Sequence, residues 1–342
     1  MIRIIFFSDT HLGFDYPIHP RVDKLRRGGD FFDRFLKVLA YAEQTKPHLV
    51  IHGGDLFFRS KISPVIRDKA YGIISSFVDR TKIPFIIVPG NHERSNLPES
   101  IFLHQPDLYI FRGPVLFDFI INNQKIKILG FPFIRNNVND VFRKIIQRYL
   151  VSKPEELNLL VMHQAIEGAT VGPGNYIFKP GHDVLAINHI PDIFSAVLCG
   201  HIHRQQVILK QGSNGVFTPI IHAGSTERTS FAEKDEKKGF FDLSFSWNVQ
   251  KSRWDILYNF VELKSRPMIE IVLTDTSQFS ESWIRKKISE LPFGSIVKFK
   301  YPKKLKQDIK ISDQIARWLK NYRDQFIFYD RNLFRQNLFG SE

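Results

Sequence analysis

The chain has 342 residues, 43% of them hydrophobic, which is enough for a large core with an appendage. Its formal net charge of +13 favours a polyanionic partner, with nucleic acid ahead of an anionic membrane. Its single cysteine, Cys199, excludes an intramolecular disulfide and a cysteine-based zinc knuckle. Because no apolar run approaches the ~20 residues that cross a bilayer and no signal peptide is visible, we expect a cytoplasmic protein without membrane contact.

The first predicted strand, residues 2–7, is short, apolar and rich in β-branched and aromatic side chains, as expected of a strand buried on both faces. It ends at Asp9 and His11, shortly before Gly13. A spacing of two places both side chains on one side of an extended segment. A carboxylate and an imidazole delivered together in this way are typical metal ligands.

Helices and strands then alternate. A helix capped at Asp30 is expected to end before Pro47, and a strand over residues 49–51 runs into Gly53-Gly54-Asp55. A second helix, residues 65–78, leads to a strand over 85–88 that ends in Asn91-His92-Glu93. This βαβ alternation predicts a layered α/β fold, in which active groups gather beyond the carboxyl ends of the strands.

The middle of the chain carries more strands of this kind. Strands over residues 159–162 and 196–199 deliver His163 and the pair His201 and His203. We expect a long irregular loop over the glycine-rich residues 168–183. Other expected elements are short strands over 109–111, 117–120 and 126–129 in the far, partly antiparallel part of the sheet, a helix over 138–150, and strands over 220–222 and 240–247.

The pattern changes near Arg266-Pro267, where we expect a domain boundary between residues 1–263 and 264–342. The second part contains two β-like runs, 268–273 and 295–301, and a helix over 282–290, without a ligand-like cluster. It has 16 Lys and Arg against 9 Asp and Glu. Lysines crowd one stretch together with Phe299 and Tyr301, namely Lys298, Lys300, Lys303, Lys304, Lys306 and Lys310. Such a run would position phosphates without reading bases, although a merely solvated basic face remains an alternative.

The polar strand ends together form one candidate metal site. It mixes carboxylate, amide and imidazole ligands without a thiolate, which suits Mn²⁺, Fe or Zn²⁺. Asp55 is predicted to bridge two ions, one bound by Asp9, His11, Asp55 and His203 and the other by Asp55, Asn91, His163 and His201. Two ions of this kind catalyse the hydrolysis of phosphoesters. His92 is not needed as a ligand, and we expect it to contact the phosphate and protonate the leaving oxygen.

The chain resembles the calcineurin-like metallophosphoesterases over residues 1–230, with five blocks in that superfamily's order: Asp9-x-His11, Gly54-Asp55, Gly90-Asn91-His92-Glu93, His163 and Gly200-His201-x-His203. Residues 12–13, 56–57, 223–231 and 237–240 are similar to the Mre11/SbcD branch of DNA-repair nucleases. The resemblance implies a four-layer α-β-β-α sandwich with a small α+β capping domain. It also implies Mn²⁺-dependent hydrolysis of DNA, with 3′→5′ exonuclease and single-strand endonuclease activities. The seven ligands and His92 inherit the family's metal-binding and catalytic roles.

The resemblance further implies an ATPase partner of the Rad50/SbcC type and a nucleoid location, and it leaves a homodimer open. Many Mre11-type chains carry a histidine three residues after the bridging aspartate, where this chain has Phe58, so an exonuclease mode that depends on that imidazole is not carried over. Related chains usually continue into helices that hold the ATPase. In this chain a short segment such as residues 315–338 could bind the ATPase, or a longer form of the chain could bind it. The third alternative is that the protein has no such partner.

Two other functions are compatible with parts of this pattern. A hydrolase of small phosphoesters or cyclic nucleotides would use the same ligand set. A non-catalytic scaffold would keep the fold for protein binding, but loss of ligands is the expected mark of that state, and all seven are intact.

Overall fold

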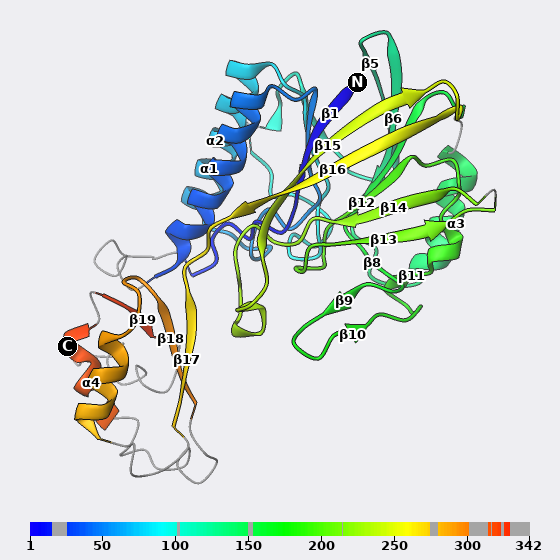
Figure 1. Ribbon diagram of the computed structural model, residues 1–342. Helices are drawn as coiled ribbons and strands as arrows, with labels where there is room; N and C mark the ends of the chain where they lie inside the picture. Colours follow the sequence, from blue (N-terminus) through cyan, green and yellow to red (C-terminus); the bar gives the residue numbers. More distant parts are fainter. Residues whose placement is uncertain are drawn as a thin grey trace. The chain divides into compact units, whose positions relative to one another are not determined.

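The computed structural model describes residues 1–15, 26–100, 103–149, 153–213, 215–273, 280–300, 314–315, 317–322 and 325–328 (Figure 1). They form two compact units. The first holds residues 1–14 and the described part of 28–264, and the second holds residues 15 and 26–27 with the described part of 265–342. Residues 15, 26 and 27 thus belong with the second unit, whereas the sequence placed them in the first. The lysines at 303–310 and much of 315–338 lie outside the described residues.

Two six-stranded sheets build the first unit (Figure 1). In the first sheet the order is β16-β15-β1-β2-β3-β4, with β1 to β4 parallel and β15 antiparallel to β1. Its strands are β1 (Ile2–Phe7), β2 (Leu49–His52), β3 (Phe85–Ile87), β4 (Leu108–Ile110), β15 (Lys238–Asn248) and β16 (Arg253–Leu263). The second sheet has the order β13-β14-β12-β7-β6-β5. Its strands are β5 (Val115–Ile121), β6 (Gln124–Phe131), β7 (Leu157–Met162), β12 (Ala196–Cys199), β13 (Gln206–Gln211) and β14 (Phe217–His222).

Helices cover the outer face of each sheet and a hydrophobic core fills the space between the sheets. Helices α1 (Gly28–Thr45) and α2 (Pro64–Thr81) lie on the first sheet, and α3 (Val138–Tyr149) lies on the second (Figure 1). The core between the sheets joins residues of β1, β2 and β15 to residues of β6, β7 and β12. The predicted four-layer α-β-β-α sandwich is therefore confirmed.

Strand β1 is apolar except at Arg3, and both of its faces are covered. Ile4 and Phe6 are fully buried and point into the core between the sheets. The opposite face carries Phe7, whose ring centre lies 6.1 Å from that of Phe35 on α1. Because both faces of the strand are covered, every side chain from Ile2 to Phe7 except Arg3 is buried.

Several elements differ from the sequence prediction. The segment predicted as one far edge of a sheet is divided, because β4 pairs with β3 in the first sheet while β5 and β6 lie in the second. Helix α1 begins at Gly28, two residues before the predicted cap. The predicted irregular loop, residues 168–183, contains the paired strands β9 (Thr170–Val171) and β10 (Tyr176–Ile177), and it is flanked by the paired strands β8 (Ala165–Ile166) and β11 (Val184–Leu185). Short 3₁₀ turns occur at Ile187–His189, Phe231–Glu233 and Lys320–Tyr322.

The second unit is a small α+β structure with its own core. Strands β17 (Met268–Val272), β18 (Ile296–Lys300) and β19 (Ile327–Phe328) form a parallel sheet, and α4 (Glu281–Ser289) begins where the Ser280 side chain accepts a hydrogen bond from the Trp283 backbone. Ile284 and Ile288 of the helix pack with residues of β17 and β18. None of the helices among the described residues has both the length and the apolar character needed to cross a lipid bilayer.

Candidate metal centre

The polar strand ends of the two sheets meet at one place within the first unit. The ends of β1, β2 and β3 are joined by backbone hydrogen bonds, including Asp9 N to Gly54 O at 2.9 Å and His11 N to Asp55 O at 3.0 Å. The second sheet reaches the same place, because the backbone N–H of His201 donates to Asp9 Oδ2 at 3.1 Å. All eight predicted site residues are brought together here: Asp9, His11, Asp55, Asn91, His92, His163, His201 and His203.

Asp9, His11 and His203 form what we call the first cluster. Its two imidazoles face each other, with 2.9 Å between His11 Nε2 and His203 Nε2. Asp9 Oδ1 lies 3.8 Å from His203 Nε2 and 4.0 Å from His11 Nε2. The other Asp9 oxygen accepts hydrogen bonds from Ser8 Oγ and His201 N, whereas Oδ1 is buried without a hydrogen-bond partner in the described part of the chain. A cation between these three donors would satisfy that oxygen.

Asp55, Asn91, His163 and His201 form the second cluster. Asn91 Oδ1 lies 3.0 Å from His163 Nε2 and 2.9 Å from His201 Nδ1. His163 Nδ1 lies 2.8 Å from the Gly53 carbonyl, to which it donates, so Nε2 is directed at Asn91 and at Asp55 Oδ2, 3.3 Å away. Asp55 also shares a group of mutually close donor atoms with His11 and His92, and another with Asp9 and His163. It therefore lies between the two clusters, as a bridging ligand must.

The side chains of His11 and His163 are fully buried, and that of His203 is 27% exposed. The His92 side chain is 32% exposed. Its backbone N–H donates to Asp55 Oδ1 at 2.9 Å, and its Nδ1 donates to the Phe58 carbonyl. Nε2 lies 3.9 Å from Asp55 Oδ2, so it could also reach a cation beside Asp55 and His11. This exposure allows the oriented His92 ring to contact a substrate.

Four of the predicted ligands are held in left-handed backbone conformations. The φ angles are +53° at Asp9, +46° at His11, +54° at Asp55 and +75° at His201. Residues other than glycine rarely adopt such angles, and they persist only where the surrounding structure enforces them. The backbone therefore turns sharply at the end of each strand, and this turn directs the side chain into the centre.

Glycines beside the ligands allow the loops to pack closely. Gly54 has φ +108°, and a Cβ placed on it would lie 2.2 Å from His163 Nδ1. A Cβ on Gly90 would lie 2.1 Å from Asp55 Oδ1. A side chain at either position would displace a ligand, which is the physical reason for the Gly54-Asp55 and Gly90-Asn91 pairs.

The electrostatics of the centre favour a cation. Burial alone would lower the pKa of His163, but the Asp55 carboxylate raises it to about 9. Burial would likewise raise the pKa of Asp55, but the His163 imidazole holds it below its usual range. Burial lowers the pKa of His201 to about 3, so that imidazole is neutral and can act as a ligand. The oxygen and nitrogen donors, the unpartnered Asp9 Oδ1 and this charge pattern together fit two divalent cations.

Two buried carboxylates that support the centre were not identified as such from the sequence. Glu93, which the sequence shows only as the neighbour of His92, is buried and accepts hydrogen bonds from the backbone N–H groups of Phe57 and Gly90. Burial, together with the nearby Asp55 carboxylate, raises its pKa to about 8. Glu233 lies 3.3 Å from His203 Nδ1. Its only sequence signal was its position between the blocks at 223–231 and 237–240.

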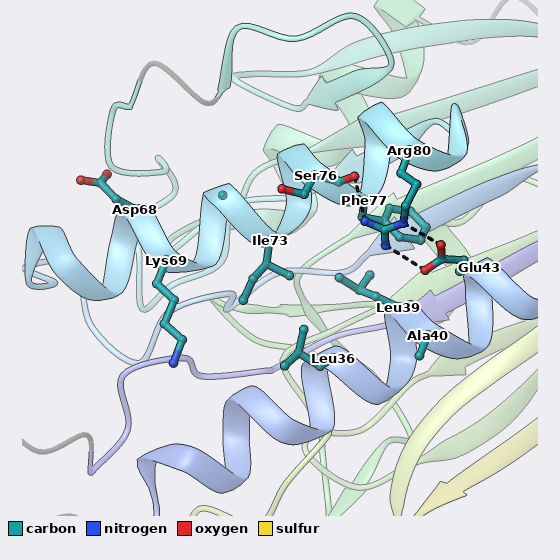
Figure 2. A pocket seen from close by; sticks show the side chains of 11 residues that line it. Leu36, Leu39, Ala40, Glu43, Asp68, Lys69, Ile73, Ser76, Phe77 and Arg80 are labelled. Carbon is teal, nitrogen blue, oxygen red and sulfur yellow. Dashed lines mark hydrogen bonds and ion pairs between the residues drawn. The ribbon is translucent and has the colours of Figure 1, made fainter.

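A surface groove of about 610 Å³ lies elsewhere, between α1 and α2 (Figure 2). Its lining is largely apolar, with Leu36 and Ile73 pointing toward each other, and the ion pair of Glu43 and Arg80 lies at one end. No histidine and no predicted site residue lines it. We therefore assign the chemistry to the strand ends and not to this groove.

The chain is similar in sequence to several proteins that are named for DNA repair or nuclease activity. The chain is 27% identical over 265 residues to the DNA double-strand break repair protein Mre11 of Methanococcus maripaludis, covering 72% of this chain and 65% of that protein. It is 26% identical to the Mre11 protein of Methanocaldococcus jannaschii, covering 82% of this chain and 72% of that protein. It is 24% identical to the SbcD component of the nuclease SbcCD of Staphylococcus epidermidis, covering 84% of this chain and 76% of that protein. The match thus spans slightly less than two thirds of the first of these relatives.

A search against protein families matches residues 2–205 to the calcineurin-like phosphoesterases. That range includes every predicted ligand and His92, and it ends just after β12 and the His201-x-His203 segment. The predicted resemblance is confirmed, and this chain belongs to the calcineurin-like phosphoesterase family.

Proposed function

We propose that this protein is a DNA phosphodiesterase that uses two divalent cations, most favourably Mn²⁺, and acts in DNA repair in the manner of the Mre11/SbcD nucleases. The observation that carries the proposal is the convergence of carboxylate, amide and imidazole donors from both sheets around Asp55. The relatives named Mre11 and the SbcD relative support DNA as the substrate.

The first cluster would hold one cation and the second cluster the other, with Asp55 contacting both. When bound, the two cations would supply Lewis acidity toward the phosphate and lower the pKa of a water in the site. The protein's own contribution is to fix the donors before substrate arrives. Asp9 is held by Ser8 and His201, and His163 by Gly53, so little reorganisation is needed at the moment of reaction.

His92 is proposed to act as the general acid. Its Nδ1 proton is engaged by the Phe58 carbonyl, so the ring is oriented and Nε2 is free to exchange protons. In its cationic form it would donate the Nε2 proton to the leaving oxygen as the phosphorus–oxygen bond breaks, leaving neutral imidazole and a hydroxyl group. Such proton transfer typically contributes ~10²–10⁴-fold in rate.

Exposed arginines near the centre favour a substrate with several phosphates. Arg59 lies 5.4 Å from the Phe58 ring, which packs against His92. Arg94 follows the Asn91-His92-Glu93 segment, and Arg135 lies two residues after Phe133, whose ring centre is 5.4 Å from that of His201. All three are exposed, and the ion pairs of the described residues leave them without a carboxylate partner. Cations placed in this way suit the phosphates that flank a scissile bond in a nucleic acid strand.

The proposal also covers the finer expectations of the resemblance. We propose 3′→5′ exonuclease and single-strand endonuclease activities, a nucleoid location, and an ATPase partner of the Rad50/SbcC type. The Phe58 ring centre lies 5.6 Å from that of His92 and 6.0 Å from that of His11, so an apolar ring stands where many relatives carry an imidazole. Because an exonuclease mode that depends on that imidazole is not carried over, endonuclease cleavage is the activity we expect to dominate.

The test is a cleavage assay on end-labelled single- and double-stranded DNA, with Mn²⁺, Mg²⁺, Fe²⁺ and Zn²⁺ supplied in turn. We expect Mn²⁺-dependent cleavage of DNA, with fragment lengths that distinguish internal cuts from stepwise removal of nucleotides. Hydrolysis of bis(p-nitrophenyl) phosphate without any cleavage of DNA would instead identify a small-phosphoester hydrolase. A protein that binds no divalent cation and cleaves neither substrate would be a scaffold.

A further inference from the structure

We propose that Glu233 and Lys238 are positioning residues for His203, and that this pair selectively sustains the cation site of the first cluster. The inference rests on the proposed two-cation function and assigns a role to residues outside the ligand set. It also gives a physical meaning to the blocks at 223–231 and 237–240, which the phosphoesterase ligands alone leave unexplained.

Glu233 fixes the ring of His203. Its Oε1 lies 3.3 Å from His203 Nδ1. Because a carboxylate can only accept a hydrogen bond, the imidazole must carry a proton on Nδ1, so Nε2 is the ring nitrogen whose lone pair can bind a cation. That Nε2 faces His11 Nε2 at 2.9 Å and Asp9 Oδ1 at 3.8 Å. A carboxylate that orients a metal-binding histidine in this way also raises its basicity.

Glu233 is itself immobilised. Thr229 Oγ1 donates to its Oε1 at 2.6 Å and Ser230 Oγ at 3.2 Å, while Ser225 Oγ donates to Oε2 at 3.4 Å. The residue is only 8% exposed. A buried carboxylate with this many donors has one favourable orientation, so the direction of the His203 ring is set before any cation binds.

The Lys238 ammonium group compensates the negative charge of the buried Glu233 carboxylate. Its side chain is fully buried, and Nζ lies 2.6 Å from Glu233 Oε2 and 3.1 Å from Glu236 Oε2. Nζ also donates to the His203 carbonyl at 2.9 Å. One ammonium group thus fixes the backbone of His203 and, through Glu233, its ring. Removing either Glu233 or Lys238 would leave the other as a less compensated buried charge, so these two residues depend on each other.

The pair connects the two sheets at the first cluster. Lys238 is the first residue of β15, which pairs with β1, and β1 delivers Asp9 and His11. His203 follows β12 of the second sheet. The second cluster is supported differently, because His163 is oriented by the Gly53 carbonyl. Loss of Glu233 should therefore weaken one cation site and leave the other intact.

The test is a calorimetric titration of the metal-free full chain with Mn²⁺. For the wild type we expect two sites. For Glu233→Gln we expect the dissociation constant of one site to rise ~10–100-fold, the usual effect of losing such a support, with the other site unchanged. Thr229→Val removes one donor to Glu233, together with the 3.4 Å contact of Thr229 Oγ1 with His203 Nδ1, without removing a charge, and it should weaken the same site by a smaller factor.

The matched control is Glu236→Gln. Glu236 contacts Lys238 and Arg204 but has no contact with the His203 ring among the described side chains, so both sites should keep their wild-type affinity. Thermal unfolding of each metal-free variant reports general damage. Equal weakening of both sites in step with a lower unfolding midpoint, or wild-type binding by both Glu233→Gln and Thr229→Val, would overturn the inference. A wild-type chain that binds no Mn²⁺ would overturn the proposed function itself.

Discussion

His92 and the ligand histidines have the same side chain but different surroundings, and we expect this difference to determine their roles. His11 and His163 are fully buried among donors, and His203 is 27% exposed with its Nδ1 beside Glu233, while the His92 side chain is 32% exposed. An imidazole held among carboxylates is suited to holding a cation. A partly exposed imidazole whose Nδ1 is engaged by a backbone carbonyl can reach a substrate and exchange protons with it.

His92→Asn should separate these two roles. We expect the variant to bind two Mn²⁺ ions with wild-type affinity, because the ligands are untouched and the backbone N–H to Asp55 remains. Turnover should fall by ~10²–10⁴-fold, because the proton donor to the leaving oxygen is lost. Calorimetry and a phosphodiesterase assay measure the two quantities. Unchanged turnover would refute the catalytic role, and loss of one cation would show that His92 is a ligand.

Gly54→Ala should damage the centre without touching a ligand. The added Cβ would lie 2.2 Å from His163 Nδ1, and the residue has φ +108°, so both His163 and the backbone must move. We expect weaker Mn²⁺ binding at the second cluster. Gly72→Ala is the control, because nothing lies within 4 Å of a Cβ there and alanine favours helix α2 by about 0.5–1 kcal/mol. Equal Mn²⁺ affinity in the two variants would contradict this account of Gly54.

At the scale of elements, the ends of the strands position the site, and an edge strand contributes to stability through an ion pair. β13 is an edge strand of the second sheet, and Lys210 on it forms an ion pair with Asp192. The Lys210 ammonium and the Ser213 backbone and hydroxyl groups lower the pKa of Asp192 to about 2. The folded state thus binds the Asp192 proton more weakly than the unfolded chain does. The pair stabilises the fold above the ordinary carboxyl pKa, and this contribution is lost as the pH falls toward 2.

Asp192→Asn tests that sign. At pH 6 we expect the variant to be less stable than the wild type, by at least the ~0.2–1 kcal/mol typical of exposed ion pairs, because the Lys210 side chain is buried. The difference should shrink as the pH falls from 4 to 2, because the carboxylate is protonated first in the unfolded chain and then, near pH 2, in the folded protein. Urea unfolding at each pH measures it. A difference that stays constant or grows on acidification would show that Asp192 does not act through its charge.

The sequence predicted the elements whose local pattern is unambiguous. Strand β1 is apolar on both faces, and strands β2, β3, β7 and β12 have the same character, so their positions and the polar residues that follow them could be found from composition alone. Edge strands are harder to predict. β13 and β16 carry exposed or polar residues such as Lys210 and Asp255, which periodicity does not distinguish from a loop.

Long-range pairing could not be predicted in the same way. The division of residues 108–131 between two sheets depends on which partner strand each segment meets, and no local pattern encodes that choice. The role of Glu233 depends on a contact with His203, 30 residues away, and on a buried Lys238. Asp9, Asp55 and His163 could be proposed as ligands because each follows an apolar strand directly. Supporting residues carry no such mark.

At the scale of the whole molecule, two sheets present their strand ends to a common centre, and exposed arginines lie on the loops around it. A net charge of +13 favours association with any polyanion, so binding alone is weak evidence for a nuclease. Stronger evidence would be that particular arginines affect the turnover of DNA. Such an effect distinguishes a contact with a phosphate near the scissile bond from general attraction to a polyanion.

The double variant Arg94→Gln with Arg135→Gln tests this phosphate binding. We expect a higher KM for an oligonucleotide and a salt dependence of DNA binding with a slope smaller by about 0.7–0.9 for each phosphate that is no longer neutralised. Hydrolysis of bis(p-nitrophenyl) phosphate should be unchanged, because that substrate has one phosphate. Arg80→Gln, which breaks an ion pair at the groove between α1 and α2, is the control. An equal loss of activity on both substrates would show that the arginines support the fold and do not bind the substrate.

The most direct measurement of the central claim is a crystal structure of the full chain grown with Mn²⁺, with the cations located by their anomalous scattering. The account predicts two Mn²⁺ ions, one ligated by Asp9, His11 and His203 and the other by Asn91, His163 and His201, with Asp55 contacting both. Cations bound elsewhere, or an Asp55 carboxylate that contacts neither ion, would contradict it.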